Sequence, residues 1–161
     1  MTEEKIVRSI SIETWCELAR DGNALPVTVP LDGESMRPLI RRGRDPVTIV
    51  PLQRPLIKGD VVLFNKGNGI YAVHRVWKIL PGAVQMLGDN CWNPDQWVPE
   101  QNVLGLVVYY TRNGRKCRLD TPKARAWGRA WMALYPVRKC YFRLRTFASR
   151  CYRAVFPKER T

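Results

Sequence analysis

The chain has 161 residues, enough for one domain with its own core plus appended segments. Its five cysteines include no Cys-x-x-Cys pair and it has one histidine, so the composition argues against a disulfide framework, a zinc site and a metal cofactor. The net charge of +13 falls in residues 111–161, which hold 15 Lys and Arg against 2 Asp and Glu, whereas residues 1–110 are neutral.

An N-terminal helix is predicted over residues 5–20. Ser11 is a suitable N-cap, and Ile10, Trp15 and Leu18 form an apolar face. We expect this helix to pack against the rest of the protein.

The hexapeptide GESMRP, residues 33–38, follows the alternating segment 25–32 and predicts a strand that runs into a tight turn. Gly33 permits a sharp turn or a close ligand approach, and Pro38 stiffens the exit. Ser35 is thereby presented as a candidate nucleophile, provided that a base reaches it. Serine is also common in plain surface turns, so the hexapeptide alone does not decide between the two readings.

Short strands separated by turn sequences follow, which indicates a mainly β, barrel-like domain. The sequence KGNG, residues 66–69, is typical of a hairpin turn. The predicted strands are residues 25–32, 46–51, 60–65, 70–80, 83–88 and 103–111.

The single histidine, His74, lies in the alternating strand segment 69–78, where a catalytic base would be firmly held. An apolar run then ends in Gly-Asp-Asn, and Asp89 is the carboxylate predicted to orient the histidine. Asp60 and Asp95 are the other candidates for this role. Trp92 and Trp97 either wall a substrate groove or cap the core.

The C-terminal segment predicts two helical stretches. Thr121 and Pro122 form a helix start, and Pro136 interrupts the helix. The later residues form a basic amphipathic helix, which either lies on an anionic membrane surface or packs on the protein's own β domain. Its apolar positions are Val137, Tyr141, Leu144, Ala148, Cys151 and Val155.

Four segments in this order resemble one family of peptidases. They are residues 33–38, 58–64, 71–76 and 87–90, and together they are similar to the catalytic core shared by type I signal peptidases and LexA-type self-cleaving repressors. The resemblance covers roughly residues 25–110 and implies a β-rich fold of that type. Bacterial signal peptidases and the repressors use a lysine base, whereas this chain has a histidine there, as in the endoplasmic-reticulum and archaeal type.

The resemblance implies a serine endopeptidase that processes signal or leader peptides without a cofactor. Ser35 would be the nucleophile, His74 the base and Asp89 the orienting acid. Gly33 and the Ser35 backbone would contribute to the oxyanion hole, and Met36 would line the substrate pocket. Many signal peptidases carry a serine where this chain has Gly33, so only backbone N–H groups remain for the oxyanion.

Other hypotheses remain open at this point: a self-cleaving regulator, a catalytically silent binding protein of the same fold, and a nucleic-acid binder. No Ala-Gly or Cys-Gly cleavage segment precedes Ser35, and phosphate binding would not require the four segments, so a peptide substrate is the favoured partner. We expect an N-terminal helical segment (1–24), a β-rich peptidase domain (25–120) and a basic helical tail (121–161). The expected location is cytoplasmic and peripheral to an anionic membrane.

Overall fold

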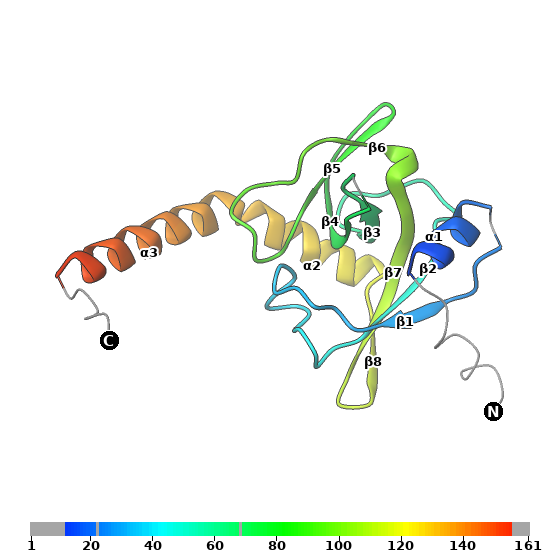
Figure 1. The fold of residues 1–161 in the computed structure, drawn as a ribbon, viewed down its shortest axis with the longest axis horizontal. Helices are drawn as coiled ribbons and strands as arrows, with labels where there is room; N and C mark the ends of the chain where they lie inside the picture. The colour runs from blue at the N-terminus through cyan, green and yellow to red at the C-terminus, as the bar shows by residue number, and fades with distance from the viewer. Residues whose placement is uncertain (1–11, 22, 68, 156–161) are drawn as a thin grey trace.

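A computed structural model describes residues 12–21, 23–67 and 69–155, with the backbone alone for 147–155. The fold is mainly β, as predicted: an antiparallel sheet curves into a half-barrel and is accompanied by three α-helices (Figure 1). In chain order the elements are α1 (Ile12–Arg20), β1 (Val27–Val29), β2 (Val47–Pro51), β3 (Val61–Asn65), β4 (Tyr71–Leu80), β5 (Ala83–Leu87), β6 (Val98–Pro99), the 3-10 helix η2 (Glu100–Asn102), β7 (Val103–Arg112), β8 (Arg115–Arg118), α2 (Pro122–Ala133) and α3 (Tyr135–Val155).

The strands pair in the order β1-β2-β7-β3-β4-β5-β6, and β8 pairs with β7 outside this path. All of these pairings are antiparallel. In the central hairpin, β3 and β4 pair with Val62 opposite His74. The histidine strand therefore lies inside the sheet, with β3 on one side and β5 on the other.

Alternation along β3 divides the core into two clusters. Val61 and Leu63 pack with Trp15 of α1, whereas Val62 and Phe64 face the opposite side of the strand and join the second cluster. Successive side chains of a strand point to opposite faces, so a strand that is apolar at every position is buried on both. Burial of Trp15 confirms that the N-terminal helix packs against the domain.

The predicted strands are confirmed, with small changes at their ends. The segment predicted over 25–32 is a strand only at Val27–Val29, and the short strands β6 and β8 were not predicted. The turn at 66–69 joins β3 and β4 as a hairpin. The predicted helix is observed from Ile12, and its proposed N-cap Ser11 lies outside the described residues.

A buried aspartate holds the segment that follows the serine turn. The Asp45 carboxylate accepts hydrogen bonds from the side chains of Arg44 and Arg112 and from the backbone N–H of Arg41. Arg112, at the end of β7, also donates to the carbonyl of Leu39 at 2.6 Å. Hydrogen bonding, above all from Arg44, holds the pKa of Asp45 well below its usual range. The exit of the serine turn is thereby fixed to the sheet.

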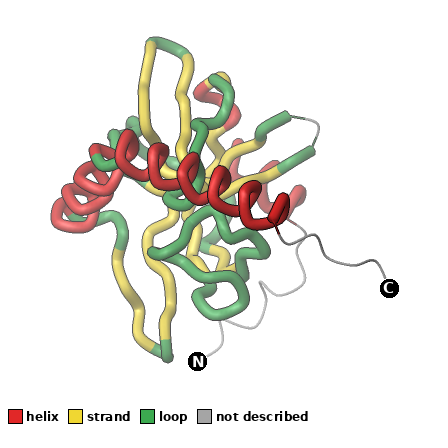
Figure 2. Tube along the Cα trace, turned by 90° about the vertical axis from the view of Figure 1, so that its left-hand side faces the viewer, coloured by secondary structure: helices red, strands yellow, loops and turns green. Residues whose placement is uncertain are grey.

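The tail forms the two predicted helices. The Thr121 side chain accepts a hydrogen bond from the N–H of Ala124, and Pro122 is the first helical residue, as predicted. The helix is interrupted at Leu134, and α3 then runs for 21 residues from Tyr135. The expected interruption at Pro136 is therefore wrong: Pro136 lies in the first turn of α3, where a proline needs no N–H partner. Figure 1 shows α3 leaving the domain as a long projection, and in Figure 2 the same helix passes in front of the rest of the molecule.

Candidate functional site

The histidine of β4 is paired with a carboxylate. His74 is buried, and its Nδ1 lies 2.5 Å from Oδ2 of Asp95. The Phe64 ring of the neighbouring strand lies 5.8 Å from the imidazole, centroid to centroid. One edge of the ring thus contacts a carboxylate while an aromatic side chain packs against it, an environment that limits how the imidazole can rotate.

Asp95 is held in place through its side chain and its backbone. Its Oδ1 accepts from Lys66 Nζ at 2.6 Å, its N–H donates to the Met86 carbonyl at 2.9 Å, and its own carbonyl accepts from the Gln85 amide at 2.9 Å. Burial alone would raise the pKa of Asp95, but the hydrogen bonds and charges of His74 and Lys66 outweigh it and leave the pKa below its ordinary value. Asp95 therefore stands beside the histidine as a fixed anion.

Asp89, the predicted orienting acid, has a different partner. Both of its carboxylate oxygens accept from the Arg75 guanidinium, at 2.9 and 2.8 Å, and both side chains are almost fully buried. The expected contact between Asp89 and His74 is therefore wrong. His74 and Arg75 are consecutive residues of β4, so their side chains point to opposite faces, and Asp89 lies on the arginine side.

The ion pair of Asp89 and Arg75 ties the sheet to α2. Arg75 Nη1 also donates to the Gly59 carbonyl at 2.8 Å. A Cβ at Gly128 of α2 would stand 2.3 Å from Arg75 Nη1, so this guanidinium occupies the space that a side chain at 128 would need. The role of Asp89 visible in the fold is thus to neutralise a buried cation beneath α2.

Gly88 is the point at which the serine turn and the histidine approach each other. A Cβ on Gly88 would stand 2.8 Å from the Ser35 carbonyl oxygen and 3.2 Å from His74 Cδ2. Two hydrogen bonds join the turn to the next loop: the Asn90 N–H donates to the Ser35 carbonyl at 2.7 Å, and the Asn90 amide donates to the Glu34 carbonyl at 3.2 Å. The absence of a side chain at 88 lets these segments pack closely.

The Ser35 side chain is half-buried. Within the described part of the chain, its hydroxyl forms no hydrogen bond, either to His74 or to any other group. The structure therefore brings the serine turn beside the histidine without the expected serine–histidine hydrogen bond. In enzymes without substrate such bonds are often long and tighten only in the complex.

The two other predicted substrate-binding residues differ in exposure. Gly33 is exposed, and a Cβ there would stand 3.7 Å from Ser35 Oγ, so a side chain at 33 would reach the serine. Met36 is buried to 1% exposure within the core cluster of Trp15. Because its side chain packs inside the domain, the expectation that Met36 lines the substrate pocket is wrong.

Asp60, the third candidate acid, has no contact with the histidine. Its carboxylate accepts from the Arg54 guanidinium, from Arg125 Nε at 3.0 Å and from the backbone N–H of Ile57 at 2.9 Å. This buried carboxylate connects the loop before β3 to α2.

Comparison with known proteins adds no family assignment. No protein-family model matches this chain, and no curated protein does.

Among the described side chains, no group of three His, Cys, Asp or Glu is arranged to hold a metal ion. None of the described helices is both long enough and apolar enough to cross a membrane.

Sequence reasoning underestimated Asp95 and did not consider Lys66. Asp95 follows Asn-Pro, a turn sequence, shortly after the Gly-Asp-Asn segment, and that position was the available signal. Lys66 belongs to the hairpin turn before the histidine strand and had no distinguishing motif. Trp92 and Trp97 are 46% and 41% exposed, and neither belongs to the two core clusters.

Proposed function

We propose that this chain is a serine endopeptidase of the signal-peptidase and LexA type, with Ser35 as nucleophile, His74 as general base and Asp95 as the orienting acid. The observation that carries the proposal is the 2.5 Å contact between His74 Nδ1 and Asp95. Cδ2 of the same ring lies close to Gly88, and the Ser35 carbonyl also lies close to Gly88. The nitrogen Nε2 is bonded to Cδ2, so the second nitrogen of the imidazole belongs to the edge nearest the serine turn.

The pairing with Asp95 suits the tautomer that a base requires. With the proton on Nδ1 donated to the carboxylate, Nε2 of His74 is free to accept the proton of the Ser35 hydroxyl. The serine oxygen then attacks the scissile carbonyl, and the imidazolium returns its proton to the leaving amine as the peptide bond breaks. Water, activated by the same base, hydrolyses the resulting acyl-enzyme and regenerates Ser35.

The developing oxyanion would be stabilised by backbone N–H groups, including that of Ser35. Gly33 offers no hydroxyl for this purpose, and loss of one such donor lowers rates by roughly 100- to 1,000-fold. The expected substrate is an extended peptide with small residues before the cleaved bond, such as a signal or leader peptide. The exposed indoles of Trp92 and Trp97 are candidate walls of the groove.

A second candidate function is a binding protein of the same fold that does not turn over. The observation that favours it is the lack of a hydrogen bond to the Ser35 hydroxyl among the described residues. Such a protein would bind peptides while leaving Ser35 unreactive.

Labelling by a serine-reactive phosphonylating probe separates these functions. Ser35 is the only serine between residues 12 and 148, so the labelled peptide is readily assigned by mass spectrometry. We expect labelling of Ser35 in the wild type, none in Ser35→Ala, and strongly reduced labelling in His74→Ala. Peptide-library cleavage in parallel tests turnover. An unlabelled Ser35 in a folded wild-type protein that still binds peptides would favour the binding protein.

A further inference from the structure

The apolar face of α3 is exposed. Val137, Tyr141 and Leu144 follow one another at spacings of four and three, which places them on one stripe of the helix. They are 66%, 61% and 66% exposed. Over the described side chains this stripe does not pack on the β domain, contrary to the alternative in which the tail covers its own sheet.

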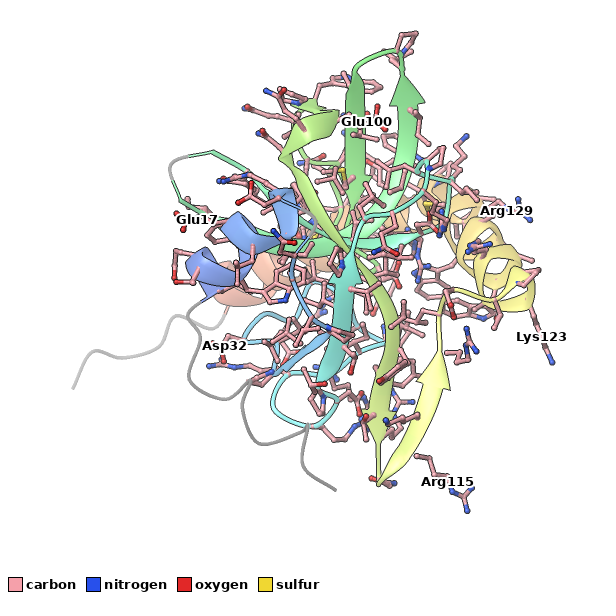
Figure 3. All side chains as sticks on the ribbon, turned by 90° about the vertical axis from the view of Figure 1, so that its right-hand side faces the viewer. Glu17, Asp32, Glu100, Arg115, Lys123 and Arg129 are labelled. Atoms are coloured by element: carbon pink, nitrogen blue, oxygen red, sulfur yellow. The ribbon has the colours of Figure 1, made fainter. Side chains whose placement is uncertain are left out.

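Cations lie at one edge of the stripe and on the opposite face of the helix. At 100° per residue, Arg145 lies beside Tyr141 on one edge of the stripe, whereas Arg143 and Lys139 lie on the opposite face of the helix. Residues 121–155 contain nine Lys and Arg and no Asp or Glu. Figure 3 shows Lys123 and Arg129 pointing outward from α2, on the side of the domain opposite Glu17 and Asp32.

We propose that α3 is a docking arm for an anionic lipid bilayer. A helix with an apolar stripe and a cationic opposite face lies in the interface of such a membrane, with the apolar side chains among the acyl chains and the cations toward the headgroups. A second copy of the chain is the poorer occupant, because two such arms would bring like charges together. A nucleic acid would engage the cations but would leave the apolar stripe uncovered.

The base of the arm contacts the loop of the proposed site. The Tyr135 hydroxyl donates to the carbonyl of Trp92 at 2.8 Å, and Arg138 Nη1 donates to the carbonyl of Asp89. Both acceptors belong to the loop 89–95, which ends at the carboxylate that pairs with the histidine. A bilayer bound along α3 therefore lies close to that loop, at the end where the arm leaves the domain.

Vesicle co-sedimentation of the full chain tests the proposal. The assay measures binding only, so its result does not depend on whether the protein is a peptidase. The vesicles are phosphatidylcholine alone or phosphatidylcholine mixed with phosphatidylserine. The apolar test variant is Val137→Glu with Leu144→Glu, and the charge variant is Arg143→Gln with Arg145→Gln. Leu80→Glu, at the exposed end of β4 and 53% exposed, is the matched control. Circular dichroism monitors the helix content of each protein.

We expect the wild type and the Leu80→Glu control to bind the anionic vesicles far more tightly than the neutral ones. The charge variant should bind roughly 30-fold more weakly, since each cation near an anionic surface contributes about a factor of five. The apolar variant should bind below detection while retaining its helix content.

Other results would overturn the docking arm. These include equal binding to both kinds of vesicle, no binding of the wild type to anionic vesicles at low salt, or undiminished binding by the apolar variant. Two further measurements address the rival occupants. Tighter binding to duplex RNA than to anionic vesicles would assign the arm to nucleic acid, and a stable dimer that Val137→Glu with Leu144→Glu dissociates would assign it to a second copy.

Discussion

Replacing Asp89 and Asp95 by asparagine should affect different properties: the first change should lower stability, and the second should lower turnover. Asp89→Asn leaves Arg75, which is 2% exposed, without its counter-charge. Breaking a buried pair in this way costs about 3–5 kcal/mol. We expect a value near 3 kcal/mol, because Arg75 retains the Gly59 carbonyl as an acceptor. For a chain of this length such a loss lowers the melting temperature by roughly 6–12 °C.

Asp95→Asn should instead affect turnover. The amide keeps the shape of the side chain, and the partner Lys66 is 35% exposed, so the free energy of unfolding should fall by less than it does in Asp89→Asn. An amide that donates to His74 Nδ1, however, stabilises the tautomer with its proton on Nε2, which cannot accept a proton from serine. The corresponding loss in a serine–histidine–acid triad is on the order of 10⁴-fold in kcat.

Two measurements compare the variants. Circular dichroism follows their thermal unfolding, and kcat for a cleaved peptide is measured well below both melting temperatures. The predicted pattern is a stable but inactive Asp95→Asn and a destabilised Asp89→Asn that is active where it is folded. A folded Asp89→Asn without turnover, together with a fully active Asp95→Asn, would refute the assignment of Asp95 and restore Asp89 as the orienting acid.

The remaining predictions concern packing, acid stability and thiol reactivity. Gly88→Ala should lower kcat/KM and destabilise the fold by about 1–3 kcal/mol, because its Cβ would stand 2.8 Å from the Ser35 carbonyl oxygen. Wild-type kcat/KM together with wild-type stability would contradict the close packing of Gly88 against the serine turn. Hydrogen bonding, chiefly from Arg44, holds the pKa of Asp45 well below its ordinary value of 3.8, so its stabilisation is present above that pH and lost as the pH falls further. Urea midpoints should therefore decline below about pH 4, and less steeply in Asp45→Asn. Burial raises the pKa of the Cys16 thiol to about 11, so at pH 8 the exposed Cys140 should be alkylated first, as peptide mass spectrometry would reveal.

The elements of the fold could be predicted because their signals are local. Alternation predicted the central strands, Lys-Gly-Asn-Gly predicted the hairpin, and Thr121 with Pro122 predicted the start of α2. The missed strand β8 is four residues long, with two arginines, a lysine and a cysteine. It exists because β7 offers it a partner across a tight turn, and its own composition contains no strand signal.

The sequence by itself determined the central strands, the three helices, and Ser35 and His74 as candidates for catalysis. It did not determine which acid pairs with the histidine, because that choice depends on which face of β4 each loop approaches. Asp89 lies on the side of Arg75, and the chain turns again before Asp95 lies beside the imidazole. The sequence also left open whether α3 covers the sheet or projects from it. Amphipathicity specifies that a helix has an apolar face, but only tertiary structure decides whether the protein itself covers that face.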